Sequence, residues 1–571
     1  MNEWINQRFR EPQSGEFYFS FIYDGKPSSE FLKDWNVTTK RQELDSDRIQ
    51  HITEYLDPTT GLLVRSTAII YRDFSAVEWV LHFSNTGDQV TPIIEKILPL
   101  NSDIIPSEPA QFTLHTSTGD YNSAESFRPS ETILNADSTI VLSAHKGRSS
   151  SNGYLPFFNL DWENGGVAMA LGWSGQWQAH FGMKAPNQLN MKGGMQHTHL
   201  KLFPGETIRT PRMLLAFWEG DEPIAGNNAM RQLLIKHYLP RRNGKLVMPP
   251  VMASVTDTAP DGTYEAPHLR VMPILAERGI EAFWSDMDPQ HWYPLGFPAG
   301  TGTWIPDPKK YPNGMRPIGK AAHDAGLDYL LWFEPERVAK GTQIDRLHPQ
   351  WLSKKGPEEV LDQFLFRMDI PEARNWLIDH IDEQITAAQI DWLRYDFNLD
   401  PLEFWQNTDT PDRQGMTEIR HIEGLYDFWD ELFRRHPNMS LDNCASGGRR
   451  IDLETISRGL PLWHSDMQCL TEDPEADQLQ NGGLYRWIPL HGCGDYGYEP
   501  SYNFRSAMSS GGLFTNHDND SMIVVHRQQE AKNLSELGIV PGPWHFIGPF
   551  INEKQPVYSH AFGPELKIDL D

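Results

Sequence analysis

The segment IDWLRYDFNLD, residues 390–400, places a carboxylate, Asp396, where a run typical of a buried strand ends. Four other apolar runs end on an acidic side chain in the same way, at Asp286, Glu334, Asp369 and Asp466. In a barrel of parallel strands, active sites collect at the carboxyl ends of the strands, so these acids would meet at one rim. They would repel one another unless cations lie among them, and three arginines are near in sequence, Arg346, Arg367 and Arg394.

Charged strand ends also occur by chance, because every strand meets solvent somewhere, but such repulsion is usually kept for function. The sequence has no HExxH motif, no Cys-x-x-Cys pair and no phosphate-binding loop, so we expect no metal and no cofactor. Ser174, in GWSGQ, lacks the spacing of a hydrolase nucleophile and is interpreted as part of a packed turn. Paired carboxylates then favour glycoside cleavage, and by position Asp396 and Asp466 are the leading pair.

The elements that must position these acids follow residue 250, where short apolar runs alternate with helical stretches. Strand and helix in strict turn indicate a parallel α/β domain, and about eight such units predict a (β/α)8 TIM barrel. The expected strands are VMASV, IEAFWSD, LDYLLWFEPE, FLFRMD, IDWLRYDF, MSLDNCAS, LPLWHSD and GGLFTN.

The first 210 residues have a different pattern, short alternating runs broken by Gly, Asn, Asp and Pro. This pattern predicts antiparallel sheets, most simply a large β-sandwich. We expect a multidomain protein with a β domain at 1–215, a helical linker at 216–249, a catalytic barrel at 250–540 and a short, incomplete C-terminal segment at 541–571.

Composition excludes several classes of protein. The 571 residues carry a formal net charge of −27, which would repel phosphate backbones and anionic lipid surfaces, so neither nucleic acid nor membrane is expected as a partner. Three cysteines are too few for a disulfide framework. The first residues lack a basic segment followed by an apolar one, and the default expectation is a cytoplasmic protein.

Five blocks, taken in order, resemble glycoside hydrolase family 36, the α-galactosidase family. The blocks are LWFEPERV, DRLHPQWL, LRYDFN, NCASGGRRIDLE and LWHSDMQ. Three earlier stretches, GYLPFFNLDW, LGWSGQWQ and FPGETIRTPRMLL, are similar to that family's N-terminal β-supersandwich. The resemblance covers roughly residues 20 to 540.

The resemblance implies a retaining mechanism, with Asp396 as the nucleophile and Asp466 as the general acid/base. An ionised Asp396 needs cationic company, which Arg394 can supply. Asp466 must hold its proton near neutral pH, so we predict a raised pKa from apolar surroundings and the nearby nucleophile. A retaining pair stands about 5 to 5.5 Å apart.

The resemblance also implies a set of substrate-binding residues: Asp286, Trp304, Arg346, Arg394, Asn398, Cys444, Gly447 and Gly448. Trp304 would stack on the sugar, because Gly and Pro surround it. The arginines would donate to hydroxyls, and the glycines would let backbone approach the sugar's second carbon. For Cys444, a small buried filler is as good an interpretation as a sugar contact.

One departure concerns the sugar. The family usually shows DDGW after the second barrel strand, whereas this chain has SDMDPQHWY, with Met287 in place of the second acid and Asp288 or His291 as candidates to compensate. The leading hypothesis is release of terminal α-linked galactose, and α-N-acetylgalactosamine or another α-hexoside stays open. A non-catalytic carbohydrate-binding protein is the third alternative. A homo-oligomer is also left open.

Overall fold

The computed structural model describes residues 2–10, 17–108, 110–254, 258–277, 279–287, 292–356, 362–470, 473–495, 506–507 and 509–514. The segment 541–571 and the pair Asp288 and His291 lie outside these residues.

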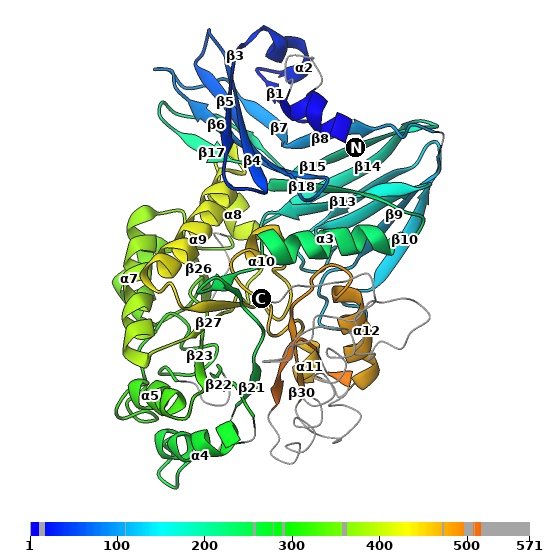
Figure 1. Ribbon diagram of the computed structural model, residues 1–571. Coiled ribbons are helices and arrows are strands. Elements are labelled where there is room, and N and C mark those ends of the chain that lie inside the picture. The colour runs from blue at the N-terminus through cyan, green and yellow to red at the C-terminus, as the bar shows by residue number, and fades with distance from the viewer. Residues whose placement is uncertain are drawn as a thin grey trace.

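The N-terminal half consists of antiparallel sheets (Figure 1). The largest runs in the order β10-β9-β12-β13-β18-β6-β5-β4-β3, with β17 also paired to β6. A second sheet has the order β11-β14-β15-β8, and a third has the order β2-β1-β7-β16-β28. The strands are β1 (Ser20–Tyr23), β2 (Lys26–Pro27), β3 (Asn36–Glu43), β4 (Arg48–Leu56), β5 (Leu62–Tyr71), β6 (Ala76–Asn85), β7 (Ile94–Leu98), β8 (Leu100–Ile104), β9 (Phe112–Ser117), β10 (Pro129–Leu134), β11 (Thr139–Ser143), β12 (Phe157–Trp162), β13 (Gly165–Gly172), β14 (Trp177–Ala185), β15 (Gln188–Met195), β16 (His199–Leu200), β17 (Thr207–Arg209), β18 (Arg212–Glu219) and β28 (Arg413–Gln414).

Burial along these strands explains why the sequence forms sheets. Along most of β5 buried positions alternate with more exposed ones, as a sheet with one covered face requires. β13, GGVAMALG, is buried at every position. Helix α3 (Ile224–His237), in the segment expected to link the domains, crosses beneath this sheet (Figure 1), so β13 is covered on both faces.

The second half is built on a parallel sheet with the order β29-β27-β23-β22-β21-β31-β30. Its strands are β21 (Val251–Ala253), β22 (Ala282–Ser285), β23 (Asp328–Phe333), β27 (Trp392–Tyr395), β29 (Ser440–Asn443), β30 (Gly492–Asp495) and β31 (Gly511–Phe514). Its longer helices are α4 (Glu265–Glu277), α5 (Arg316–Asp324), α7 (Pro371–Ala388), α9 (Met416–Arg435) and α12 (Pro474–Leu484). The first four lie outside β22, β23 and β27 in Figure 1.

Residues 460–462 connect the two ends of this sheet. The N–H of Leu460 donates to the carbonyl of Leu441 on β29, and the N–H of Asn443 donates to the carbonyl of Leu460. On the other side, the N–H of Gly492 on β30 donates to the carbonyl of Pro461. The expected strand LPLWHSD therefore lies between β29 and β30, although it forms only isolated β-bridges, Leu460 with Asp442 and Ser465 with Gly447.

One expected barrel strand was wrong. FLFRMD forms β26 (Gln363–Phe366), which pairs antiparallel with β24 (Arg337–Ala339) and β25 (Leu352–Ser353) outside the parallel sheet. Asp369, which we expected at the barrel rim, follows this outer strand and forms an ion pair with Arg367. The pattern of apolar residues shows that a short strand is buried, but it does not show to which sheet the strand belongs. The strand that sequence reasoning missed is β30, whose sequence GCGD is too rich in glycine to read as a strand.

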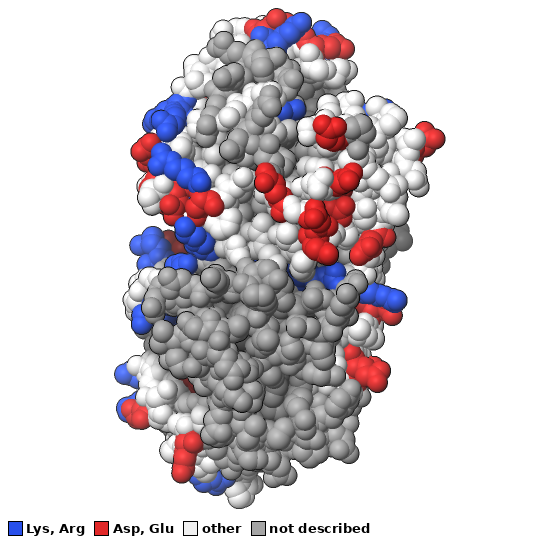
Figure 2. Space-filling view, turned by 45° about the vertical axis from the view of Figure 1, so that its right-hand side comes forward, with Lys and Arg blue, Asp and Glu red and all other residues white. Residues whose placement is uncertain are grey.

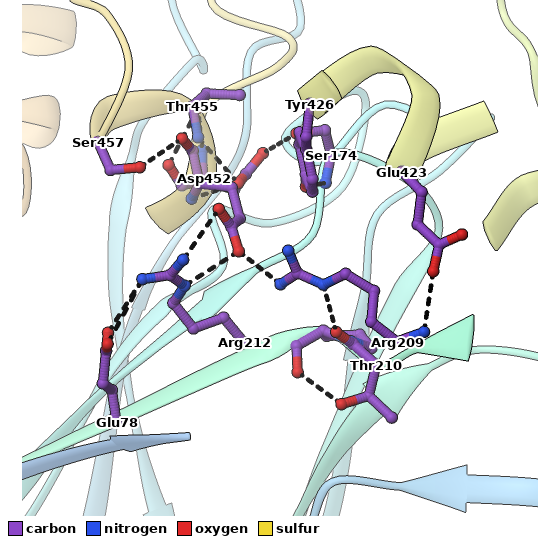
Figure 3. Close-up of polar contacts among 12 residues, drawn as sticks. Glu78, Ser174, Arg209, Thr210, Arg212, Glu423, Tyr426, Asp452, Thr455 and Ser457 are labelled. Atoms are coloured by element: carbon purple, nitrogen blue, oxygen red, sulfur yellow. Dashed lines mark hydrogen bonds and ion pairs between the residues drawn. The ribbon is translucent and has the colours of Figure 1, made fainter. Parts of the chain in front are cut away.

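The two halves meet across a buried ionic cluster (Figure 3). Glu454, in the short helix α10 (Leu453–Ile456), is fully buried and pairs with Arg209 at 2.5 Å and Arg212 at 3.0 Å, both from the N-terminal half. Arg212 also reaches Glu78 on β6 at 3.2 Å. A buried carboxylate with several guanidinium partners is costly to separate, so α10 is held firmly against the β domain.

The surface agrees with the acidic composition. In the upper, β-rich half of Figure 2, Asp and Glu side chains gather at the centre and right, while Lys and Arg side chains lie mainly at the left edge. Within the described residues, none of the helices combines the length and the hydropathy that a membrane span needs.

Candidate active site

Asp396 directly follows β27, and four N–H groups surround its carboxylate. Oδ1 accepts from the backbone of Phe397 at 2.7 Å and of Ser446 at 3.0 Å. Oδ2 accepts from the side chains of Asn398 at 2.6 Å and Trp332 at 3.1 Å. The residue is only 4% exposed, so these donors replace the water that an ionised carboxylate would otherwise need.

The electrostatics of Asp396 favour the ionised form. Burial by itself raises the pKa of this carboxyl, but the charge of Arg394 and the hydrogen bonds from Ser446, Asn398 and Cys444 lower it, and the net pKa lies below the ordinary value. An ionised, water-poor carboxylate at a strand end has the properties of a nucleophile.

Arg394, two residues earlier on β27, connects the acids of three strands. Its Nε lies 2.9 Å from Asp286 after β22, and its Nη1 donates to Asp442 on β29 at 2.5 Å. Its Nη2 donates to the sulfur of Cys444 at 3.5 Å, and the guanidinium stacks 4.3 Å above the ring of Trp284. With these partners and 5% exposure, Arg394 is placed as electrostatic support for the acids.

Asp466 lies at the end of the 460–466 segment and has the opposite tendency. Burial raises the pKa of its carboxyl to about 7, with further contributions from the negative charges of Asp396 and Asp120 and opposition from Arg394 and Arg449. Cys444 responds to both acids: burial raises the pKa of its thiol, and Asp396 and Asp466 add to the rise. The thiol is therefore placed in the field of both carboxylates, and stays protonated.

Gly447 and Gly448 allow a close approach of two backbones. Gly447 has φ +75°, and a Cβ there would lie 2.5 Å from the backbone nitrogen of Asp466. A Cβ on Gly448 would overlap the carbonyl oxygen of His464. We expected these glycines to admit a sugar, whereas in the structure they admit the segment that carries Asp466.

Two expected binding residues lie apart from the carboxylates. Trp304 is 0% exposed and packs against the rings of Tyr293 at 5.3 Å and Trp332 at 5.9 Å, so the interpretation of an exposed stacking platform was wrong. It supports Trp332, which in turn donates to Asp396. Arg346 is exposed on helix α6 (Gln343–Leu347), and among the described residues its guanidinium forms no ion pair. The remaining predicted residues lie around Asp396 and Asp466.

Sequence reasoning missed several residues of the site. Trp332 stands in the run LDYLLWFEPE, where only the acid Glu334, at the end of the apolar stretch, gave a signal. Glu334 is fully buried, accepts from the N–H of Asn398 at 2.5 Å, and has a pKa raised to about 8, chiefly by burial and partly by Asp396, against Arg337. Asp442 could have been found from the sequence, because it is a charged residue inside a run that otherwise reads as a buried strand.

Two further residues come from the N-terminal half. Asp120 accepts from the N–H of Gly448 and the hydroxyl of Ser465, both at 2.9 Å. Arg148 donates to the carbonyls of Phe397 and Ala445. Nothing in the sequence connects these side chains to a site some 300 residues later.

Metal-binding geometry occurs elsewhere. Within the described residues, the one group of side chains close enough to share a metal ion is Asp47, Asp73 and His237 in the N-terminal half. The ammonium of Lys236 already pairs with both aspartates, at 3.0 and 2.7 Å.

Fold and site together define a protein with a β domain and a parallel α/β domain that bears unlike carboxyls beside its strand ends. Residues 268–478 match the family model Melibiase. Alpha-galactosidase 1 of Pediococcus pentosaceus is 24% identical over 70% of this chain and 54% of its own length, and Alpha-galactosidase Mel36A of Lactobacillus acidophilus is 23% identical over 78% and 60%. The chain thus spans little more than half the length of these curated relatives.

Solved structures show the same fold. The α-galactosidase from Lactobacillus brevis superposes with a TM-score of 0.74 at 20% identity, covering 90% of this chain and 73% of that one. A variant of the α-galactosidase AgaA from Geobacillus stearothermophilus, in complex with raffinose, gives 0.74 at 19% identity, with 91% and 76% covered. The resemblance to the α-galactosidases of glycoside hydrolase family 36 is confirmed by these matches.

Proposed function

We propose that this chain is a retaining glycoside hydrolase that releases terminal α-linked galactose, with Asp396 as nucleophile and Asp466 as general acid/base. The observation that carries the proposal is a pair of neighbouring acids whose surroundings shift their pKa values in opposite directions: the pKa of Asp396 is lowered, whereas that of Asp466 is raised to about 7. Pairs of carboxyls whose surroundings separate their pKa values divide into a base or nucleophile and an acid.

In the proposed reaction, Asp396 attacks the anomeric carbon while Asp466 gives its proton to the departing oxygen. The glycosyl group is then held as an ester on Asp396. Asp466, now ionised, takes a proton from water, and that water displaces Asp396 and restores both groups. The four N–H donors on Asp396 orient its carboxylate and stabilise it as the leaving group of this second step.

We place the sugar in contact with Asp286, Asn398 and Cys444, which lie around the carboxylates. Oδ2 of Asp286 forms an ion pair with Arg394, and its Oδ1 accepts a hydrogen bond from the N–H of Met287 at 2.6 Å. Arg346 stays in the proposal as a residue at the outer rim. Complexes of AgaA variants with raffinose and stachyose support an α-galactoside as the substrate.

We further propose that the second domain is a closed (β/α)8 barrel and the first a β-supersandwich, with the boundaries 1–215, 216–249 and 250–540. Support for closure comes from residues 460–462, whose hydrogen bonds to Leu441, Asn443 and Gly492 join the ends of the seven-stranded parallel sheet. With that segment as the eighth strand, Asp466 follows a strand end as Asp396 does.

The test uses the variants Asp396→Ala and Asp466→Ala with an aryl α-galactoside. Asp396→Ala should lose about 10³-fold or more in kcat, and added azide should yield the β-galactosyl azide, because azide then occupies the place of the nucleophile. Asp466→Ala should keep activity on substrates whose leaving group needs no proton, and azide should yield the α-galactosyl azide. Substantial turnover by Asp396→Ala without azide would remove it from the nucleophile role.

A panel of aryl α-glycosides tests the sugar. Hydrolysis of the galactoside well above the N-acetylgalactosaminide and the glucoside supports the proposal. A preference for either of the other two glycosides would indicate that Met287, in place of the second acid, changes which sugar the site accepts. Binding without turnover across the panel would instead indicate a carbohydrate-binding protein.

A further inference from the structure

Arg148 brings the N-terminal β domain into direct contact with the loops beside Asp396. It lies between β11 and β12 and is 2% exposed. Its Nη1 donates to the carbonyl of Phe397 at 2.8 Å, to the carbonyl of Ala445 at 3.0 Å and to the hydroxyl of Ser446 at 3.2 Å. Its Nη2 donates to Asp400 at 2.9 Å. One side chain therefore joins the loop after β27 to the loop after β29.

The groups that Arg148 touches are those that hold the carboxylate of Asp396. Phe397 and Ser446 supply the two backbone N–H groups on Oδ1. The hydroxyl of Ser446 also donates to Oδ1 of Asn398 at 2.6 Å, whose amide donates to Oδ2 of Asp396. Three of the four donors on Asp396 thus depend on a residue that Arg148 contacts directly or through Ser446.

The loop after β29 is fixed to the β domain along its remaining length too. The hydroxyl of Ser150 donates to the carbonyl of Gly448 at 2.6 Å and accepts from the N–H of Ile451 at 2.9 Å. Further along, Ser174 donates to Asp452 at 2.9 Å, next to the ionic cluster of Glu454 (Figure 3). Because the loop is anchored elsewhere, losing Arg148 should alter its end near Ser446 without releasing it altogether.

A link between domains would not by itself require an arginine at this place. Burial lowers the pKa of the Arg148 guanidinium to about 10, only partly offset by Asp400, which shows that the site is an unfavourable one for a cation. Nη1 of Arg148 faces two backbone carbonyls and a hydroxyl, while Nη2 donates to Asp400 in another direction. A planar guanidinium can serve both directions at once, and the single nitrogen of lysine cannot.

We propose that Arg148 is a positioning residue for the nucleophile: it fixes the loops after β27 and β29 so that the N–H groups of Phe397 and Ser446 point at Asp396. This inference rests on the proposed role of Asp396. It makes the β domain a working part of the catalytic site, beyond its role in the fold.

The consequence is a specific change in pH dependence. With weaker donors, the pKa of Asp396 rises, so the acid limb of kcat/KM moves to higher pH. Other titratable groups face Asp396 from the surrounding elements and remain in place in an Arg148 variant: Asp286 after β22, Tyr293, Glu334 after β23, Arg394 on β27, Cys444 after β29 and Asp466.

The experiment compares Arg148→Met and Arg148→Lys with Arg231→Met as the matched control. Arg231 is likewise buried, at 1% exposure, and donates to a backbone carbonyl, that of Tyr485, at 2.9 Å. The readouts are the pH profile of kcat/KM for an aryl α-galactoside and the melting temperature. For both Arg148 variants we expect kcat lower on the order of 10- to 100-fold and an acid limb about one pH unit higher. Arg231→Met should change the melting temperature alone.

An acid limb that stays at the wild-type position in Arg148→Lys, or that moves as far in Arg231→Met, would overturn the inference. If Arg148→Met does not fold, Arg148→Lys, which keeps charge and length, decides the question. Failure of the proposed function is distinguishable, because the wild-type protein would then show no turnover of the galactoside at all.

Discussion

Asp466→Asn should stabilise the protein at alkaline pH, an effect independent of any activity assay. The pKa of this carboxyl is about 7 in the folded protein, against an ordinary value of 3.8, so the group is held against ionisation. At about 1.36 kcal/mol per pH unit, the difference corresponds to about 4 kcal/mol. Because the folded pKa is the higher one, the folded protein binds the extra proton between these two values. The free energy of unfolding therefore falls as pH rises from about 4 to 7.

The amide of asparagine resembles the protonated carboxyl but does not ionise. At pH 4 we expect Asp466→Asn and the wild-type protein to unfold with similar free energies. At pH 8 the variant should be more stable by up to about 4 kcal/mol, the full cost of the buried charge. The assay is urea unfolding at a series of pH values between 4 and 8, followed by tryptophan fluorescence.

Asp88→Asn serves as the control, since Asp88 is an exposed residue in the connection from β6 to β7. It should show the same small difference from wild type at every pH. If the stability difference for Asp466→Asn is also constant from pH 4 to 8, Asp466 does not hold a proton in the folded protein. The assignment of the general acid would then be lost.

Two further substitutions test the supports of the site. Arg394→Lys should destabilise the fold by about 3 kcal/mol or more and move the acid limb of kcat/KM to higher pH, because one ammonium cannot occupy both the position of Nε beside Asp286 and that of Nη1 beside Asp442; an unchanged profile would contradict this. Gly447→Ala would add about 1–2 kcal/mol of backbone strain, because residue 447 has a positive φ. Its Cβ would also push the backbone of Asp466 away, so kcat should fall. Measured kcat equal to wild type would show that the 447 and 466 backbones separate freely.

The sequence predicted those parts of the fold that depend on local pattern. Alternation in segments such as β5 predicted the antiparallel sheets, and buried runs ending in acids predicted the parallel strands and Asp396. It failed where tertiary contact decides. FLFRMD has the composition of a buried strand, yet its partners are β24 and β25. Trp304 lies among glycines and prolines, yet the rings of Tyr293 and Trp332 enclose it. Residues such as Arg148 carry no periodic signal, because their role exists only after two domains meet.

Of the three acids around Arg394, Asp396 is the one whose pKa lies below the ordinary value. Arg394 is shared with Asp286 and Asp442, and in both of these burial outweighs the guanidinium, so that their pKa values are raised. Asp396 is also buried, but its carboxylate receives four N–H donors from three segments of the chain. Hydrogen bonds to the charged form therefore add to the charge of Arg394 in lowering the pKa of Asp396. Three of these donors, on Phe397, Asn398 and Ser446, stand on the loops after β27 and β29, which Arg148 of the β domain contacts.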